Sequence, residues 1–219
     1  MANESSGFHC LIIDWGGVLT EPTGGPVGRW LSQRGVDRKV FHAVLSEWGD
    51  DVDPAAPPTP LQLIERGQIT IEEFEVLISL ELTRRTGIDY PKQGLFDGMW
   101  LSLEHDYAMQ DLVRQMRQSG VRVVLLSNSW GNPYKRESWS ELFDEVIVSG
   151  EVGMRKPDVE IYELALERAG HPADACVFLD DMLVNVEMAR SLGITSVHHR
   201  DFAGSEPEIK RLFSSYFEQ

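Results

Sequence analysis

Short apolar runs recur along the chain, and helical patterns separate most of them. Runs of this length that are apolar throughout are typical of strands in a parallel sheet covered on both faces. The predicted strands are Phe8–Ile13, Val121–Leu126, Val146–Val148, Cys176–Leu179 and Thr195–His198. The predicted helices, each followed by a glycine that can end it, are Leu103–Ser119, Asp158–Ala169 and Met182–Leu192. This alternation predicts an α/β fold with a doubly wound, Rossmann-like parallel sheet.

The segment that follows the first predicted strand has a different pattern. Proline and glycine cluster at residues 21–28 and again at 53–58, and the sequence between them is helical in character. Thr70 and Glu73 have the spacing of a capping box that starts a helix. We therefore predict a helical cap over residues 21–100, inserted into an α/β core made of residues 1–20 and 101–219.

Composition and charge narrow the range of partners. The chain has 219 residues and a formal net charge of −15, with no Lys/Arg-rich run. Such a surface repels phosphate backbones, so we expect no nucleic-acid partner. The N-terminus lacks the basic and apolar regions of a signal peptide, and no apolar stretch approaches the roughly 18 residues of a membrane span. We expect a soluble cytoplasmic protein with no membrane contact.

Polar residues follow four of the predicted strands. Asp14 ends the first apolar run, Ser127 and Asn128 follow the second, and Asp180-Asp181 follow the fourth, with Asn185 four residues later. Lys156 comes shortly after the third run. Because the carboxyl ends of parallel strands lie along one edge of the sheet, we expect these side chains to meet there.

Together these residues supply what phosphoryl transfer needs. A carboxylate can attack phosphorus and form an acyl-phosphate, which divides one difficult displacement into two. Attack by an anion on an anion needs a cation, and paired carboxylates with a backbone oxygen suit Mg²⁺. Ser127 and Lys156 would hold the phosphoryl oxygens.

Three of these segments carry a family resemblance. The runs 126–130 (LSNSW), 152–157 (VGMRKP) and 177–181 (VFLDD) resemble motifs of the haloacid dehalogenase superfamily. The resemblance is strongest to the branch that contains the N-terminal phosphatase domain of soluble epoxide hydrolase, and residues 66–70 (RGQIT) are similar to part of its helical cap.

The resemblance implies a role for each residue. Asp14 corresponds to the aspartyl nucleophile and a metal ligand, and Gly16 to the residue whose backbone carbonyl binds Mg²⁺. Asp181 corresponds to a direct metal ligand, with Asp180 in a water-mediated or lysine-pairing position. The phosphate-binding positions fall on Ser127, Asn128 and Lys156, and Asn185 corresponds to a secondary position that orders the metal loop.

Gly16 departs from the family pattern, because phosphatases of this family usually have an aspartate there. That aspartate protonates the leaving oxygen and later activates water, and help of this kind contributes about 10²–10⁴-fold. The side chains to test as replacements are His42, Glu47 and His105. Alternatively, the substrate has a good leaving group.

The sequence therefore predicts a Mg²⁺-dependent phosphatase that acts on a small phosphorylated metabolite. The alternatives are a catalytically weak protein that binds a ligand or regulates, a phosphonatase-like enzyme or a dehalogenase-like hydrolase. A phosphonatase would need a cap lysine for a Schiff base, and the cap offers Lys39 and Lys92. A dehalogenase works without metal, which fits the Asp180-Asp181 pair poorly.

Overall fold

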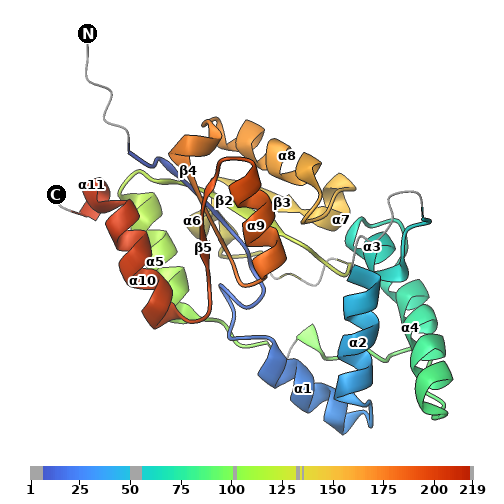
Figure 1. Cartoon of the computed structure of the whole chain (residues 1–219). Helices are drawn as coiled ribbons and strands as arrows, with labels where there is room; N and C mark the ends of the chain where they lie inside the picture. Colours follow the sequence, from blue (N-terminus) through green and yellow to red (C-terminus); the bar gives the residue numbers. More distant parts are fainter. Residues whose placement is uncertain (1–6, 50–55, 101–102, 132–133, 135, 218–219) are drawn as a thin grey trace.

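A computed structural model describes residues 7–49, 56–100, 103–131, 134 and 136–217. Five parallel strands form one sheet in the order β3-β2-β1-β4-β5 (Figure 1). Their bounds are β1 Cys10–Ile13, β2 Arg122–Ser127, β3 Glu145–Val148, β4 Cys176–Asp180 and β5 Thr195–His198. The predicted doubly wound α/β sheet is confirmed.

Strand β1 lies at the centre of the sheet and is buried along its whole length. Its last residue, Ile13, pairs with Leu125 of β2 on one side and with Leu179 of β4 on the other. The chain winds outward from β1 in both directions, and ligands of open α/β sheets bind at such a switch point. The register therefore places Asp14 beside the ends of β2 and β4.

Helices cover both faces of the sheet (Figure 1). Helices α5 (Tyr107–Gln118), α6 (Trp139–Leu142) and α10 (Phe202–Leu212) pack on one face, and α11 (Ser214–Phe217) follows α10. Helices α8 (Val159–Ala169) and α9 (Leu183–Ser191) pack on the other. The short helix α7 (Ser149–Val152) and the 3-10 turn η2 (Ala173–Ala175) complete the elements around the sheet.

Helices α1 to α4 form a group of their own beside the carboxyl ends of the strands (Figure 1). Their bounds are α1 Gly24–Gln33, α2 Arg38–Gly49, α3 Pro60–Glu65 and α4 Ile71–Thr86. They pack around their own apolar cluster, in which Phe74 and Phe96 stack with ring centroids 5.8 Å apart. The predicted capping box is confirmed, because the Thr70 hydroxyl accepts from the Glu73 N–H at 3.2 Å and the Glu73 carboxylate accepts from the Thr70 N–H at 2.8 Å.

Some predicted boundaries were wrong. The helix predicted from Leu103 begins at Tyr107, because the Asp106 side chain accepts from the Met109 N–H at 2.9 Å and caps it there. The strand predicted to end at Leu126 includes Ser127, and β4 includes Asp180. Both polar residues thus belong to strands, and the regular backbone of each strand fixes their positions.

None of the helices in the described part of the chain combines the length and the apolar character that a membrane span requires.

Candidate active site

Asp14 follows β1 and is buried. Its N–H donates to the carbonyl of Leu179 at 3.0 Å, so the hydrogen-bonded ladder with β4 continues one residue past the strand. The chain then turns: the N–H of Leu19 donates to the Trp15 carbonyl at 2.9 Å, and the N–H of Gly17 donates to the Thr20 hydroxyl at 2.9 Å. This turn directs Asp14 toward the ends of the neighbouring strands.

The two glycines of the turn have different constraints. Gly17 has φ +71°, and a Cβ there would collide with the Asp181 carboxylate. Only glycine lets the turn approach Asp181 this closely. Gly16 has no such constraint, since a Cβ at that position would meet nothing closer than the Thr23 methyl at 3.9 Å. The sequence singled out Gly16 for its missing acid, whereas Gly17 is the position where the backbone requires glycine.

Lys156 connects the acids. Its buried ammonium donates to Asp14 Oδ1 at 2.7 Å and to Asp180 Oδ2 at 2.6 Å. Burial opposes the charge on Lys156, but the Asp14 and Asp180 carboxylates outweigh it and raise the pKa of the lysine above its ordinary value. Lys156 therefore stays charged and holds both carboxylates in place.

Two asparagines orient these charged groups. The Asn128 side chain donates to the Lys156 carbonyl at 2.9 Å and accepts from the Lys156 N–H at 2.8 Å. The Asn185 amide donates to both oxygens of Asp180, at 3.0 and 3.1 Å. Asn128 thus fixes the backbone of the lysine, and Asn185 fixes the acid that the lysine contacts.

Ser127 lies at the end of β2 and is buried. Its hydroxyl shares a hydrogen bond of 2.9 Å with the Tyr134 hydroxyl, which also donates to the Asn128 carbonyl at 3.3 Å. Sequence reasoning missed Tyr134, because nothing in the loop after β2 indicates that its side chain folds back onto the strand end. Its phenol orients the serine.

Three carboxylates meet beside Lys156. Oxygens of Asp14, Asp180 and Asp181 all lie within 4.8 Å of one another. Burial raises the pKa of Asp14 to about 7 even though Lys156 opposes the shift, and burial together with Asp180 raises the pKa of Asp181 to about 6. Closely spaced carboxylate oxygens are the ligands that Mg²⁺ prefers, so the donor set fits this ion.

Magnesium is expected to stabilise the protein more at about pH 8 than at about pH 5.5, because the ion competes with protons for the same oxygens. Both acids have pKa values above the ordinary aspartate value of 3.8, so at these two positions the folded state holds more protons than the unfolded state. The contribution of these two acids to the stability of the metal-free protein therefore falls as pH rises from about 4 to about 7. Thermal melting with and without MgCl₂ at the two pH values measures the effect. If MgCl₂ raises the melting temperature equally at the two pH values, this expectation is contradicted.

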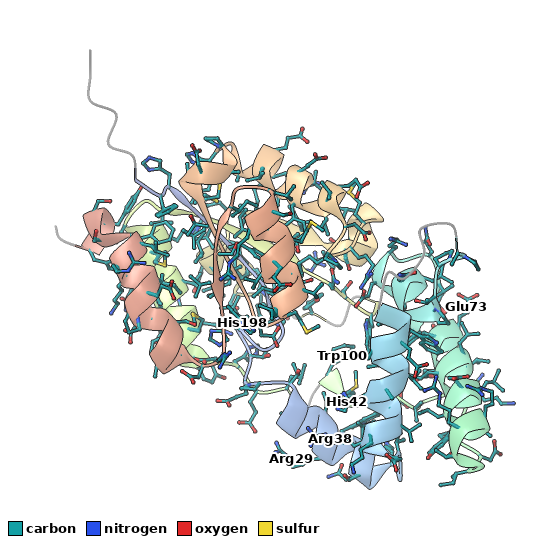
Figure 2. The ribbon with its side chains drawn as sticks, in the orientation of Figure 1. Arg29, Arg38, His42, Glu73, Trp100 and His198 are labelled. Carbon is teal, nitrogen blue, oxygen red and sulfur yellow. The ribbon has the colours of Figure 1, made fainter. Side chains whose placement is uncertain are left out.

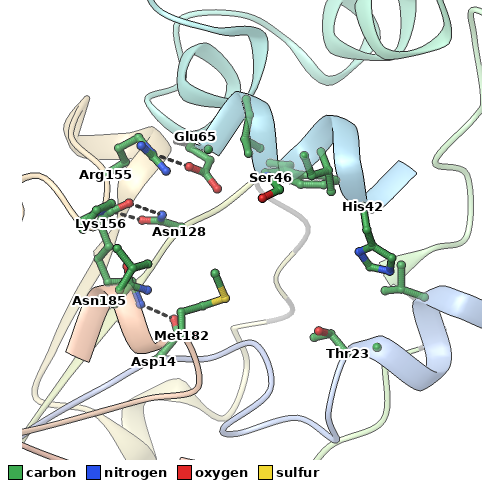
Figure 3. Close-up of a pocket in the computed structure, with 18 of the residues that line it drawn as sticks. Asp14, Thr23, His42, Ser46, Glu65, Asn128, Arg155, Lys156, Met182 and Asn185 are labelled. Atoms are coloured by element: carbon green, nitrogen blue, oxygen red, sulfur yellow. Dashed lines mark hydrogen bonds and ion pairs between the residues drawn. The ribbon is translucent and has the colours of Figure 1, made fainter. Parts of the chain in front are cut away.

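A cavity of about 1030 Å³ opens beside Asp14 and Lys156. Figure 3 shows Asp14, Asn128, Lys156 and Asn185 on one side of it, and Thr23 and His42 on the opposite side. The inserted helices and the segment after them contribute a mostly apolar wall: Val27, Phe41, Leu45, Leu61, Met99 and Trp100. Figure 2 places His42 and Trp100 among these helices and His198 at the end of β5.

The structure distinguishes among the three side chains that are candidate replacements for the missing acid at position 16. His42 lines the cavity. Glu47 instead pairs with Arg85 at the surface of the inserted helices, at 2.5 Å. His105 is hydrogen-bonded to Gln110 at 3.0 Å and is not among the described residues that line the cavity. Of the three, His42 alone is in a position to meet a ligand in this cavity.

Two ion pairs join the inserted helices to the loop that carries Lys156. Arg155 Nε donates to Glu65 at 2.6 Å, and Arg66 pairs with Asp158 at 2.8 Å. Glu65 and Arg155 also line the cavity, close to Lys156 (Figure 3). Sequence reasoning missed both pairs, because their members lie about ninety residues apart along the chain and no local pattern joins them.

This geometry agrees with a family match. The model of the haloacid dehalogenase-like hydrolases matches residues 8–193, and the chain belongs to that family of hydrolases. The resemblance drawn from the three motifs is confirmed.

Among curated relatives, a drimenol cyclase of Aspergillus calidoustus is 41% identical over 221 residues, 95% of this chain and 36% of the relative. A sesquiterpene phosphatase of Aspergillus oryzae is 34% identical over 114 residues, 50% of this chain and 58% of the relative. Bifunctional epoxide hydrolase 2 of Sus scrofa is 29% identical over 221 residues, 94% of this chain and 39% of the relative. The chain spans less than two thirds of each of these relatives.

Solved structures share the fold. A haloacid dehalogenase family enzyme from Bacteroides thetaiotaomicron, in complex with magnesium and inorganic phosphate, has a TM-score of 0.62 and 22% identity, covering 91% of this chain and 99% of that one. A hydrolase of the same family from Porphyromonas gingivalis has a TM-score of 0.65 and 23% identity, covering 94% and 97%.

Proposed function

We propose that this hydrolase is a Mg²⁺-dependent phosphatase that acts on a small phosphorylated substrate through an aspartyl-phosphate on Asp14. One observation carries the proposal: the buried Asp14 carboxylate lies 2.7 Å from the Lys156 ammonium, beside two further acids, and faces a cavity large enough for a ligand. The family match and the phosphatase among the relatives support it.

In the first step an Asp14 oxygen attacks phosphorus, and the bond to the leaving oxygen breaks. Lys156 holds Asp14 in position, and its charge reduces the repulsion between the carboxylate and the phosphoryl group. The Ser127 hydroxyl, at the neighbouring strand end, would exchange its hydrogen bond with Tyr134 for one that it donates to a phosphoryl oxygen. In the second step water attacks the same phosphorus, and Asp14 leaves as a carboxylate.

Magnesium would be held by Asp14, Asp181 and the Gly16 carbonyl, with Asp180 beside them. When bound, it supplies positive charge that offsets the charge of the phosphoryl group. Asp180 contacts Lys156 and Asn185, so its part in this scheme is to position the lysine.

We further propose that the alcohol part of the substrate is apolar. Residues 21–100 would act as a cap domain over the core of residues 1–20 and 101–219, and the wall that they contribute to the cavity is mostly apolar. The hydroxyls of a sugar phosphate would find few partners along that wall beyond Thr23, His42 and Ser46, at about 1–3 kcal/mol for each group left buried and unsatisfied. The sesquiterpene phosphatase among the relatives supports an apolar substrate.

A second candidate is a catalytically weak protein that binds a phosphorylated ligand, and the absence of an acid at Gly16 favours it. A phosphonatase-like reaction has less support, because Lys39 and Lys92 are exposed and do not belong to the described lining of the cavity. The dehalogenase-like alternative also has less support, because the cluster of acids suits a metal-dependent reaction.

The test is the hydrolysis of p-nitrophenyl phosphate with MgCl₂, repeated with excess EDTA. The proposal expects turnover that EDTA abolishes and that excess Mg²⁺ restores. Measurable phosphate and Mg²⁺ binding by calorimetry without turnover of this substrate would favour the binding protein instead.

A further inference from the structure

Position 16 lacks an acid although the backbone there admits a side chain. The nearest atom to a Cβ on Gly16 is the Thr23 methyl, at 3.9 Å, and the backbone there does not require glycine. A side chain can therefore begin at this position without a shift of the backbone. Without an acidic side chain, Gly16 has no proton to give to the leaving oxygen.

The described residues that line the cavity offer no clear substitute. Besides Asp14 and Lys156, the titratable side chains are His42, Glu65 and Arg155. Burial raises the pKa of the Glu65 carboxyl, and the Arg155 Nε that donates to it at 2.6 Å opposes that shift and keeps the carboxylate engaged in an ion pair. His42 lies on the side of the cavity opposite Asp14 (Figure 3).

A leaving group that departs without a proton has to be a weak base. The alkoxide of an ordinary alcohol is a strong base and is a poor leaving group without an acid. A phosphate monoester, released from a diphosphate, is a weak base, since the second pKa of such a phosphate is about 6. Cleavage of the phosphoanhydride therefore needs no acid at position 16.

The cavity also holds a group suited to a second phosphate. Arg155 lies next to Lys156 in sequence and lines the cavity at the same end (Figure 3). Its guanidinium has five N–H donors in a planar fork that matches phosphate geometry, and the Nε donor is directed to Glu65. Beyond it lies the apolar wall.

We propose that the substrate is the diphosphate ester of an apolar alcohol and that the enzyme removes the terminal phosphoryl group. The inference rests on the proposed function. An Asp14 oxygen forms the new bond to the terminal phosphorus, and the bond to the bridging oxygen breaks with its electron pair on that oxygen. The products are the alkyl monophosphate, held by Arg155, and, after water attacks the aspartyl-phosphate, inorganic phosphate.

The first test compares n-decyl diphosphate with n-decyl monophosphate, which share one apolar chain and differ in the leaving group. The expected kcat/KM is at least about 100-fold higher for the diphosphate, because the monophosphate lacks the help that an acid gives. Gly16→Asp is expected to raise the rate on the monophosphate and to shrink the ratio. Equal kcat/KM values for the two substrates in the native protein would overturn the inference.

The second test separates Arg155 from its structural contact with Glu65. Arg155→Gln is expected to lower the ratio of kcat/KM for n-decyl diphosphate to that for p-nitrophenyl phosphate by about 10-fold or more. Arg66→Gln breaks the other ion pair to the same loop and should leave this ratio unchanged. Glu65→Gln removes the ion-pair partner but keeps the Arg155 guanidinium, so it should also leave this ratio unchanged. An unchanged ratio in Arg155→Gln would remove Arg155 from the inference.

p-Nitrophenyl phosphate distinguishes the proposed function from the diphosphate inference, because its phenolate departs without a proton. If its hydrolysis does not depend on Asp14, the proposed function fails. If it depends on Asp14 while the two decyl substrates react equally, only the diphosphate inference fails.

Discussion

Asp14→Asn is expected to lower kcat for p-nitrophenyl phosphate by about 10⁴-fold, the scale on which enzymes lose activity when a nucleophile is removed. Asparagine has the same shape, but its amide does not attack phosphorus. The substitution also leaves Lys156 paired with Asp180, at 2.6 Å, so the fold is expected to persist. Initial rates with MgCl₂, together with a melting curve for each protein, measure the two effects.

Asp111→Asn is the matched control. This acid is exposed on α5 and pairs with Arg114, away from the cavity. Its substitution is expected to change neither the rate nor the melting temperature beyond experimental error. A folded Asp14→Asn protein as active as the native one would exclude Asp14 as the nucleophile.

Lys156→Ala is expected to destabilise the fold by about 3–5 kcal/mol, the usual cost of removing one partner of a buried ion pair. Asp14 and Asp180 would lose their shared cation and remain as buried carboxylates close to Asp181. Activity should fall as well, because the charge that reduces repulsion at the phosphoryl group is lost. Urea denaturation gives the change in the free energy of unfolding.

Lys210→Ala provides the comparison, since Lys210 forms an exposed pair with Glu206 one helical turn away. Such pairs contribute about 0–1 kcal/mol. If both lysine substitutions cost the same small free energy, the three buried groups are not coupled as the geometry indicates.

The sequence predicted that the polar residues at the strand ends would meet at one edge of the sheet, because the carboxyl ends of parallel strands all lie there. Asp14, Ser127 and Asp180 each end an apolar run, and the register between β1 and its two neighbours brings those ends to one edge. Lys156 lies beyond β3 and reaches the same edge through its long side chain. The capping box at Thr70 is equally local and was predicted for that reason.

What the sequence missed depends on contacts between distant segments. Tyr134 folds back onto Ser127 from an irregular loop, and Glu65 meets Arg155 from an inserted helix. The position of an irregular loop and the docking of one group of helices on another are tertiary properties, which periodicity does not encode. The demand for glycine at position 17 arises in the same way, because it comes from Asp181 across the fold.

The apolar wall and the acids are complementary parts of one cavity. The inserted helices cover the strand ends with apolar side chains, and the charges beneath are paired among themselves through Lys156. A ligand that fills the cavity would displace water and strengthen the electrostatic interactions among these charges. The proposed substrate, charged at one end and apolar at the other, matches this arrangement.

The most direct test of the central claim is the covalent intermediate itself. Native protein and Asp14→Asn would be mixed with p-nitrophenyl phosphate and MgCl₂, quenched in acid within the first turnover, and digested for mass spectrometry. The account predicts one added phosphoryl group on the peptide that contains Asp14 in the native protein and none in the variant. A phosphoryl group on another residue, or turnover with no protein-bound phosphate at any quench time, would contradict it.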